Sequence, residues 1–280
     1  MAIRGAADNH RISVALTFDF DAESVWLGSF KVDTPSALSR GAYGANEGVP
    51  RILKLLDRYQ LPATFFIPGD TADRHPKETR NIAAAGHEIG HHGYCHEPPH
   101  TLTEREEKTM LERGLDALDR IVKCKPRGYR SPSWELSTNT YRLLAEYGFD
   151  YDASQLAWDR PYWVEDAGKN TNIVEVPGAW ELTDSAHFLY ALVPVYLAGL
   201  SATSKVEEIW LGDFDGAYAE GGDVCYVLTM HPQIIGRHHR IAMLERALKY
   251  ILGHPGVWFA QMSEIADDFR RRQSEEKKSS

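Results

Sequence analysis

Short strand patterns alternate with amphipathic helix patterns along most of the chain. Ile12–Phe20 is an almost unbroken run of β-branched and apolar residues, which is typical of a strand buried on both faces. A helical pattern follows over Asn46–Tyr59, and strand and helix then alternate six or seven times. Such alternation is typical of βαβ units, whose strands pair in parallel. We therefore expect an α/β fold, either a barrel or an open sheet.

The whole pattern fits one domain of this kind. No repeat or linker interrupts it, so we expect a single domain over residues 1–270 and a charged, flexible tail over residues 271–280. Residues 22–45, rich in Gly, Ser and aromatic residues, are expected to form a long loop over a site. Further strands are expected at Ala63–Ile67, His87–Gly90, Phe149–Asp152, Ile173–Val176, Val224–Thr229 and Val257–Phe259. Further helices are expected at Pro76–Ala85, Thr103–Lys123, Thr138–Tyr147 and Arg240–Leu252, and Ser263–Arg271 is expected to close the fold.

Charge and cysteine content restrict the class of protein. The 280 residues include 31 basic and 40 acidic ones, and this formal net charge of -9 argues against a nucleic-acid or anionic-membrane surface. The first ten residues lack the apolar segment of a signal peptide, and the three cysteines have no close spacing. We therefore expect a cytoplasmic protein with neither nucleic-acid nor membrane partners.

The longest apolar run covers residues 186–200. It is broken by His187 and Pro194 and is shorter than the roughly 20 residues that span a bilayer. Most such runs are buried, so we expect it to belong to the core. The alternatives are an apolar lip beside a site or a contact between the subunits of a homo-oligomer.

Four of the twelve histidines lie within ten residues, in the segment Gly86–Glu97. Neutral imidazole is a common metal ligand, and the spacing of four residues in His87/His91 and in His92/His96 could bring two imidazoles to one metal ion. A surface loop that happens to be rich in histidine is the alternative. A metal would also need a charged oxygen ligand from elsewhere in the chain.

Polar residues follow the predicted strands, at the ends where parallel sheets collect reactive groups. The first strand ends at Asp19 and Asp21, which point to the same side because side chains alternate along a strand. Arg130 and His231 follow later strands. Taken singly, the two aspartates could be a solvated strand end or a helix N-cap. Arg130 could form a surface salt bridge, and His231 could be a turn residue. Their coincidence favours a site for metal binding or proton transfer.

The chain contains, in order, Leu16-Thr-Phe-Asp19-Phe-Asp21, Gly86-His-Glu-Ile-Gly-His-His92-Gly-Tyr-Cys-His96, Arg130-Ser-Pro132-Ser-Trp134, a weak fourth motif around Trp180 and Asp184, and Leu228-Thr-Met-His231. Over Ile12–Phe269 this series resembles the polysaccharide deacetylase superfamily, the NodB-homology or carbohydrate esterase family 4 hydrolases. The segments Asp21–Trp26 and His231–Arg237 are similar to the intracellular branch that includes peptidoglycan-deacetylase-like and allantoinase-like proteins.

The resemblance implies a fold and a cofactor. The fold is a distorted (β/α) barrel of six or seven parallel strands in a single domain, with one divalent metal ion, usually zinc. Asp21, His92 and His96 would bind the metal and leave positions open for water and substrate. The other two histidines of the segment would then be structural.

The same resemblance implies roles in catalysis. Asp19 would be the base that removes a proton from water, and Arg130 would position it and favour its ionised form. His231 would protonate the leaving nitrogen. A backbone N–H near Trp134 would help the metal to hold the oxyanion.

Three residues depart from the family pattern. Phe20 separates two carboxylates that are usually adjacent, so the geometry decides which is base and which is ligand. Gly93 replaces a Ser or Thr that braces the metal loop, and Trp134 replaces a Tyr. The tryptophan and the aromatic loop indicate a pocket more enclosed than an open polymer groove. The expected pocket residues are Trp26, Trp134, Trp180 and Asp184.

The sequence thus predicts a metal-dependent hydrolase of a non-peptide C–N bond that deacetylates an N-acetylated sugar or polysaccharide. A cytoplasmic amidohydrolase that opens a small cyclic imide or ureide is the alternative. A non-catalytic barrel that binds a carbohydrate or a partner is the third reading. The sequence does not distinguish which amide is cut, which metal is bound or how many subunits assemble.

Overall fold

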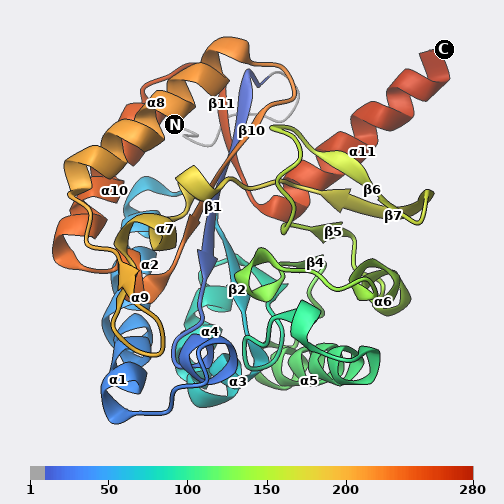
Figure 1. Cartoon of the computed structure of the whole chain (residues 1–280). Coiled ribbons are helices and arrows are strands. Elements are labelled where there is room, and N and C mark those ends of the chain that lie inside the picture. Colours follow the sequence, from blue (N-terminus) through green and yellow to red (C-terminus); the bar gives the residue numbers. More distant parts are fainter. Residues whose placement is uncertain (1–9, 280) are drawn as a thin grey trace.

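A curled sheet lies at the centre of the molecule (Figure 1). The computed structural model describes residues 10–279. Its central sheet consists of β1 (Ile12–Asp19), β2 (Thr64–Ile67), β3 (Glu88–His91), β4 (Gly128–Tyr129), β5 (Tyr151–Asp152), β6 (Tyr162–Asp166), β7 (Lys169–Glu175), β10 (Cys225–Met230) and β11 (Val257–Ala260). The strand order is β10-β1-β2-β3-β4-β5-β7-β6, with β11 also paired to β1.

The expected α/β fold with a parallel sheet is confirmed. Only β6 runs antiparallel to its neighbour, so eight strands pair in parallel within the described residues, rather than six or seven. The end strands β10 and β6 do not pair with each other there. The sheet is therefore a half-barrel, which matches the expected distorted barrel.

Helices surround the sheet (Figure 1). They are α1 (Pro35–Tyr43), α2 (Val49–Tyr59), α3 (Gly69–Arg74), α4 (Pro76–Ala84), α5 (Glu104–Val122), α6 (Thr140–Tyr147), α7 (Asp184–Phe188), α8 (Thr203–Glu220), α9 (Pro232–Ile235), α10 (His238–Leu252) and α11 (Met262–Ser279). The longest of the expected helices, α5, begins at a capping box, in which the Thr103 hydroxyl accepts from the Glu106 N–H and the Glu106 carboxylate accepts from the Thr103 N–H.

Strand β1 is buried at all eight positions. Its alternate residues Val14, Leu16 and Phe18 belong to one apolar cluster, whereas Ala15 belongs to another on the opposite face. Burial on both faces explains why the segment lacks the polar alternation of a half-exposed strand. β1 also has partners on both edges, because it pairs with β10, β2 and β11.

The prediction of a long loop over residues 22–45 is wrong. The segment contains a π-helical turn at Val25–Ser29 and then α1, and a second π-helical turn at Gly44–Gly48 leads into α2. A Cβ on Gly41 would lie 2.4 Å from the Ala22 carbonyl oxygen. This glycine permits close packing of α1 against the chain. In the sequence, the glycines of this segment looked like those of a loop.

The chain beyond residue 270 is also helical, where a separate tail was expected. Helix α11 continues to Ser279. Arg271 and Arg272 both form ion pairs with Asp268, three and four residues earlier. Opposite charges three or four residues apart stabilise an exposed helix. The charged composition alone had suggested a flexible tail.

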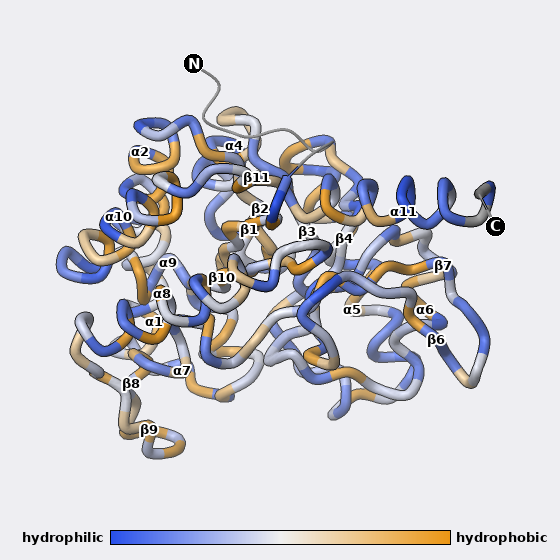
Figure 2. Tube along the Cα trace, turned by 90° about the horizontal axis from the view of Figure 1, so that it is seen from above, coloured by the Kyte–Doolittle hydropathy of each residue, from blue (hydrophilic) through white to orange (hydrophobic). Residues whose placement is uncertain are grey.

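The apolar run at residues 186–200 does not lie mainly in the core, contrary to expectation. It contains a projecting hairpin of β8 (Tyr190–Ala191) and β9 (Leu197–Ala198), seen at the lower left of Figure 2. Its exposed apolar residues are Leu192, Val193, Val195, Tyr196 and Leu200, which are 51–66% exposed. Across the described residues, no helix has the length and apolar content needed to cross a membrane.

Candidate active site

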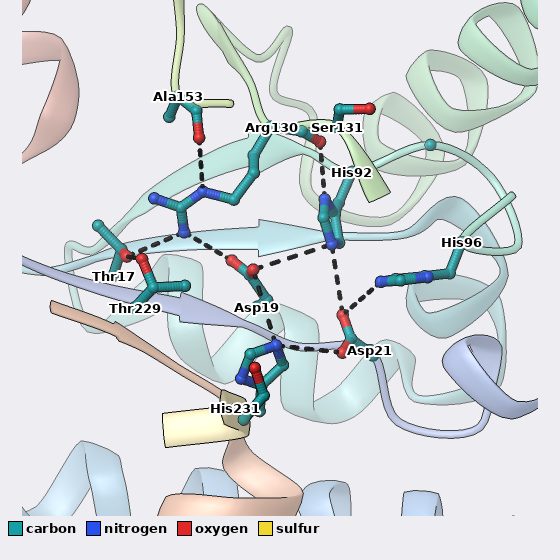
Figure 3. Close-up of polar contacts among 12 residues, drawn as sticks. Thr17, Asp19, Asp21, His92, His96, Arg130, Ser131, Ala153, Thr229 and His231 are labelled. Atoms are coloured by element: carbon teal, nitrogen blue, oxygen red, sulfur yellow. Dashed lines mark hydrogen bonds and ion pairs between the residues drawn. The ribbon is translucent and has the colours of Figure 1, made fainter. Parts of the chain in front are cut away.

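Two carboxylates stand at the end of β1 (Figure 3). Asp19 is the last residue of the strand, and Asp21 follows two positions later; both are buried and both line one cavity. Phe20 between them is fully buried in the main apolar cluster. The alternation of side chains thus brings both carboxylates into the same space.

His92 and His96 approach Asp21 from the loop after β3 (Figure 3). The Asp21 Oδ1 atom lies 3.5 Å from Nε2 of His92 and 3.7 Å from Nε2 of His96. One ligand atom from each of the three residues falls within 4.8 Å of the others. The three side chains therefore form a compact group with the donor types of a divalent-metal site.

Hydrogen bonds fix the tautomers of these two histidines. Nδ1 of His92 donates to the Arg130 carbonyl oxygen at 2.7 Å. The Ser29 hydroxyl donates its proton to the His96 carbonyl oxygen, so at 2.6 Å it accepts from Nδ1 of His96. Both Nε2 atoms are therefore unprotonated and face a carboxylate oxygen.

This arrangement fits a cation. The Asp21 Oδ1 and His92 Nε2 atoms are buried acceptors with no hydrogen-bond partner. Burial lowers the pKa of His92 to about 4 and lowers that of His96 well below its ordinary value, which keeps both rings neutral. Burial raises the pKa of Asp21 to about 7, and a bound cation would favour its ionised form.

The other two histidines of the segment lie elsewhere. His91 is buried, with Nε2 3.1 Å from the Leu111 carbonyl oxygen and Nδ1 accepting from the Gly93 N–H. His87 is packed on the Phe65 ring, with the ring centroids 5.5 Å apart. Neither is among the three grouped ligands.

Arg130 binds the second carboxylate. Its Nη1 donates to Oδ1 of Asp19 at 2.7 Å and to the Thr17 hydroxyl at 2.9 Å, and its Nε donates to the Ala153 carbonyl oxygen. Burial alone would raise the pKa of Asp19, but the charge of Arg130, with that of His231, lowers it below its ordinary value. Asp19 is therefore held as a carboxylate while Asp21 faces the histidines.

His231 closes the site from the end of β10. Its Nε2 lies 3.9 Å from Asp19 Oδ2 and 3.8 Å from Asp21 Oδ2. On its other side, Nδ1 lies 2.6 Å from Asp184 Oδ1, and the backbone N–H donates to Asp184 Oδ2. Burial would lower the pKa of His231, but the charge of Asp184 outweighs it and raises the pKa to about 9. The imidazole is thus held as a proton donor that faces the carboxylates.

Comparison with known proteins shows the family to which the chain belongs. The family model for polysaccharide deacetylase matches residues 6–151. The peptidoglycan deacetylase of Helicobacter pylori is 33% identical over 95% of this chain and 99% of its own length. The chain belongs to the polysaccharide deacetylase family. It is therefore a hydrolase that acts on C–N bonds other than peptide bonds.

Solved structures support the same family. A candidate polysaccharide deacetylase from Mycobacterium smegmatis is 38% identical, with a TM-score of 0.89 over 95% of this chain and 92% of that chain. The allantoinase PuuE is 27% identical, with a TM-score of 0.80 over 94% of this chain and 91% of that chain. The family fold therefore extends over nearly the whole chain.

The group of titratable residues lies in a cavity of about 860 Å³. Trp26, Trp134 and Trp180 line it, as expected, and the last two rings pack with centroids 4.6 Å apart. Leu189, Tyr190 and Leu200 line it too, so part of the apolar run at residues 186–200 forms a wall of the cavity.

Asp184, in contrast, is not a pocket residue. It is fully buried behind His231, at the start of α7, and does not line the cavity. The weak fourth motif indicates that Asp184 lies near the site but does not indicate which way its side chain points. The expectation of a substrate contact was wrong because the carboxylate satisfies both N–H groups of His231 instead.

The structure also bears on Gly93 and on the backbone N–H of Trp134. Gly93 has φ of +73°, which a Ser or Thr would adopt only with strain, and a Cβ there would lie 3.1 Å from Met110 Sδ. The loop therefore needs glycine here and still brings His96 to Asp21. At the third motif, the Trp134 N–H already donates to the Ser131 carbonyl oxygen, so it is not free to hold an oxyanion.

Sequence reasoning missed two polar residues at the site. Gln233 lines the cavity and donates to Asp21 Oδ2 at 3.2 Å. Its place two residues after His231 is a signal that could have found it. Ser29, which fixes the His96 tautomer, lies in the segment expected to be a loop, and nothing in its sequence context marks it.

Proposed function

We propose that this protein is a metal-dependent N-deacetylase of an N-acetylated amino sugar or glycan. The observation that carries the proposal is the grouping of a metal-type triad, an Asp19–Arg130 pair and a His231–Asp184 pair in one cavity. The peptidoglycan and polysaccharide deacetylases among its relatives support an acetamido substrate.

Asp21, His92 and His96 would hold one divalent metal ion, with zinc as the first candidate because the donors are two neutral imidazoles and a carboxylate. A bound ion of this kind supplies a Lewis acid that polarises the substrate carbonyl and acidifies water. Ser29 and the Arg130 carbonyl orient the two imidazoles, and Gln233 orients the carboxylate.

Asp19 and His231 divide the proton transfers between them. Asp19, kept ionised by Arg130, accepts a proton from the attacking water. His231, kept protonated by Asp184, donates a proton to the leaving nitrogen, because an amide anion is too poor a leaving group to depart unprotonated. Nε2 of His231 lies 3.9 Å from Oδ2 of Asp19, so the acid and the base face the same part of the cavity.

A cyclic imide or ureide is the second candidate substrate. The cavity is enclosed by tryptophans and by the apolar wall of the β8–β9 hairpin, which suits a small ring better than a long polymer. The structural likeness to the allantoinase PuuE points in the same direction. The acid and base described above would serve ring opening equally well.

One substrate panel tests the proposal. The purified protein is analysed for bound metal and is then incubated with N-acetylglucosamine oligomers, with allantoin and with cyclic imides. We expect metal near one ion per chain and acetate release from the acetylated sugars. Ring opening without acetate release would reverse the order of the two candidates. The His92→Ala variant is the control, since it should lose metal and both activities.

A further inference from the structure

Three arginines line one wall of the cavity. Arg40 belongs to α1, Arg237 directly precedes α10, and Arg240 lies in the first turn of α10. Their exposure is graded: Arg240 is buried at 7% exposure, Arg40 is half-buried, and Arg237 is exposed. The wall therefore extends from inside the cavity to its rim.

Aromatic rings hold these guanidinium groups in place of carboxylates. Arg40 lies over the Trp26 ring at 4.6 Å, Arg237 over Tyr43 at 3.6 Å and Arg240 over Phe188 at 4.4 Å. Within residues 10–279, no ion pair joins any of the three to an acidic side chain. Arg40 also donates from Nη2 to the Tyr190 carbonyl oxygen, so only part of its hydrogen-bonding edge is in use. Stacking on a ring orients the plane of a guanidinium and leaves the rest of its edge for another group.

The buried member of the group has an unused donor. Nη1 of Arg240 donates to the Ile234 carbonyl oxygen, but its buried Nε has no hydrogen-bond partner. Asp184 is near enough for its charge to act on Arg240, but its two oxygens accept from the two N–H groups of His231. A buried donor without a partner is costly, so an acceptor that came within reach of the Arg240 guanidinium would be bound favourably.

The start of α10 adds positive charge to the same wall. The first turn contains no acidic residue, and the side chain of Arg237 at the N-cap makes no capping hydrogen bond. A helix N-terminus bears a partial positive charge, so cations placed there repel it, whereas an anion is attracted. Beyond the effect of burial, the charge of Arg237 lowers the pKa of Arg40 and of Arg240, which shows that the guanidiniums also repel one another.

We propose that this arginine wall, formed by Arg40, Arg237 and Arg240, binds a carboxylate on the substrate. The inference rests on the proposed function, because the wall and the candidate catalytic groups line the same cavity. A carboxylate matches the planar edge of a guanidinium, and within the described residues the three guanidinium groups of the wall have no carboxylate partner of their own. A chain with a net charge of -9 places this positive wall beside its reactive groups, so it selects an anionic amide over a neutral one.

Calorimetric titration of the metal-loaded protein with two matched sugars tests the inference. N-acetylmuramic acid bears a carboxylate beside its acetamido group, and its methyl ester replaces that carboxylate by an uncharged group that is one methyl larger. We expect the acid to bind about tenfold more tightly or better. The preference should disappear in Arg240→Met, diminish in Arg237→Gln and return in part in Arg240→Lys.

Arg246→Met is the matched control, because Arg246 lies on the same helix but is exposed and pairs with Glu207. Equal affinity for acid and ester, or equal losses in Arg246→Met and Arg240→Met, would overturn the inference. Tighter binding of N-acetylglucosamine 6-phosphate than of the acid would overturn the choice of a carboxylate. A preference for the acid without hydrolysis of either sugar would support the wall and contradict the proposed function. If Arg240→Met does not fold, the exposed Arg237 variant alone decides.

Discussion

At the scale of single residues, the environments of Asp19 and Asp21 separate two chemically identical side chains. One faces a buried guanidinium and the other faces two neutral imidazoles. The nearest charge, more than sequence position, sets the chemistry open to each carboxyl group. The inserted Phe20 is compatible with both roles because it places the two carboxylates on one side of the strand.

We expect Asp19→Asn to retain bound metal but to lose turnover by about a hundredfold or more, because the base is removed while the triad stays intact. The measurements are kcat and metal content by elemental analysis. Some loss of Tm is also expected, since Arg130 keeps its charge in a buried place without its partner. Asp33→Asn on the exposed surface is the control. Full activity in Asp19→Asn would contradict the assignment of the base.

We expect Asp184→Asn to lower kcat by roughly two orders of magnitude or more while metal content is unchanged. Both carboxylate oxygens accept N–H groups of His231, and an asparagine would turn an NH2 group toward one of them. The imidazole would then lose its orientation and its positive charge. If kcat stays within twofold of the parent protein, Asp184 has no positioning role.

Glu175 provides a test by pH. It is fully buried beside Asp152, and burial together with that neighbouring charge raises its pKa well above the ordinary value. The folded protein then retains a proton that the unfolded chain releases, so the free energy of unfolding should fall as pH rises above about 4.5. Glutamine cannot titrate. Between pH 5 and 7, the free energy of unfolding of Glu175→Gln should therefore fall less steeply with pH than that of the parent protein, by up to about 1.4 kcal/mol per pH unit. Urea unfolding at several pH values measures this; parallel slopes would show that Glu175 is ionised in the fold.

At the scale of elements, α1 packs closely against the chain at Ala22, just after Asp21, because Gly41 has no side chain. We expect Gly41→Ala to destabilise the fold by about 1–3 kcal/mol, since its Cβ would lie 2.4 Å from the Ala22 carbonyl oxygen. Gly212→Ala, in the exposed middle of α8 with no atom within 4 Å, should instead stabilise it by about 0.5–1 kcal/mol. Denaturant unfolding of both variants measures the difference, and the same sign in both would contradict the packing argument.

The elements also show where sequence reasoning succeeds. Strand ends are predictable because short apolar runs are local patterns, and so the positions of Asp19, Arg130 and His231 after strands could be predicted before any role was assigned to them. The direction of Asp184 depends on a tertiary contact with His231 that no local pattern encodes. Composition misled at residues 22–45 and 186–200, because glycine also permits close helix packing and apolar residues also line cavities.

At the scale of the whole molecule, the triad joins the loops after β1 and β3. We expect removal of metal with a chelator to lower Tm by roughly 10 °C, because a tightly bound ion stabilises only the folded state. Restoring one equivalent of zinc should restore the Tm. His92→Ala supplies the control, as its Tm should not respond to chelator. An identical response in both proteins would place the ion elsewhere.

The position of β1 has a consequence for biosynthesis. Ser13 pairs with Cys225 and Trp258, so the first strand finds two of its three neighbours only after more than 200 further residues have been made. At common rates of translation this interval is roughly 10–40 s, during which a strand that is buried along its whole length in the fold lacks two of its partners. Contacts so distant in sequence also slow folding. The newborn chain should therefore depend on chaperones, and circular permutants that begin near β10 should depend on them less.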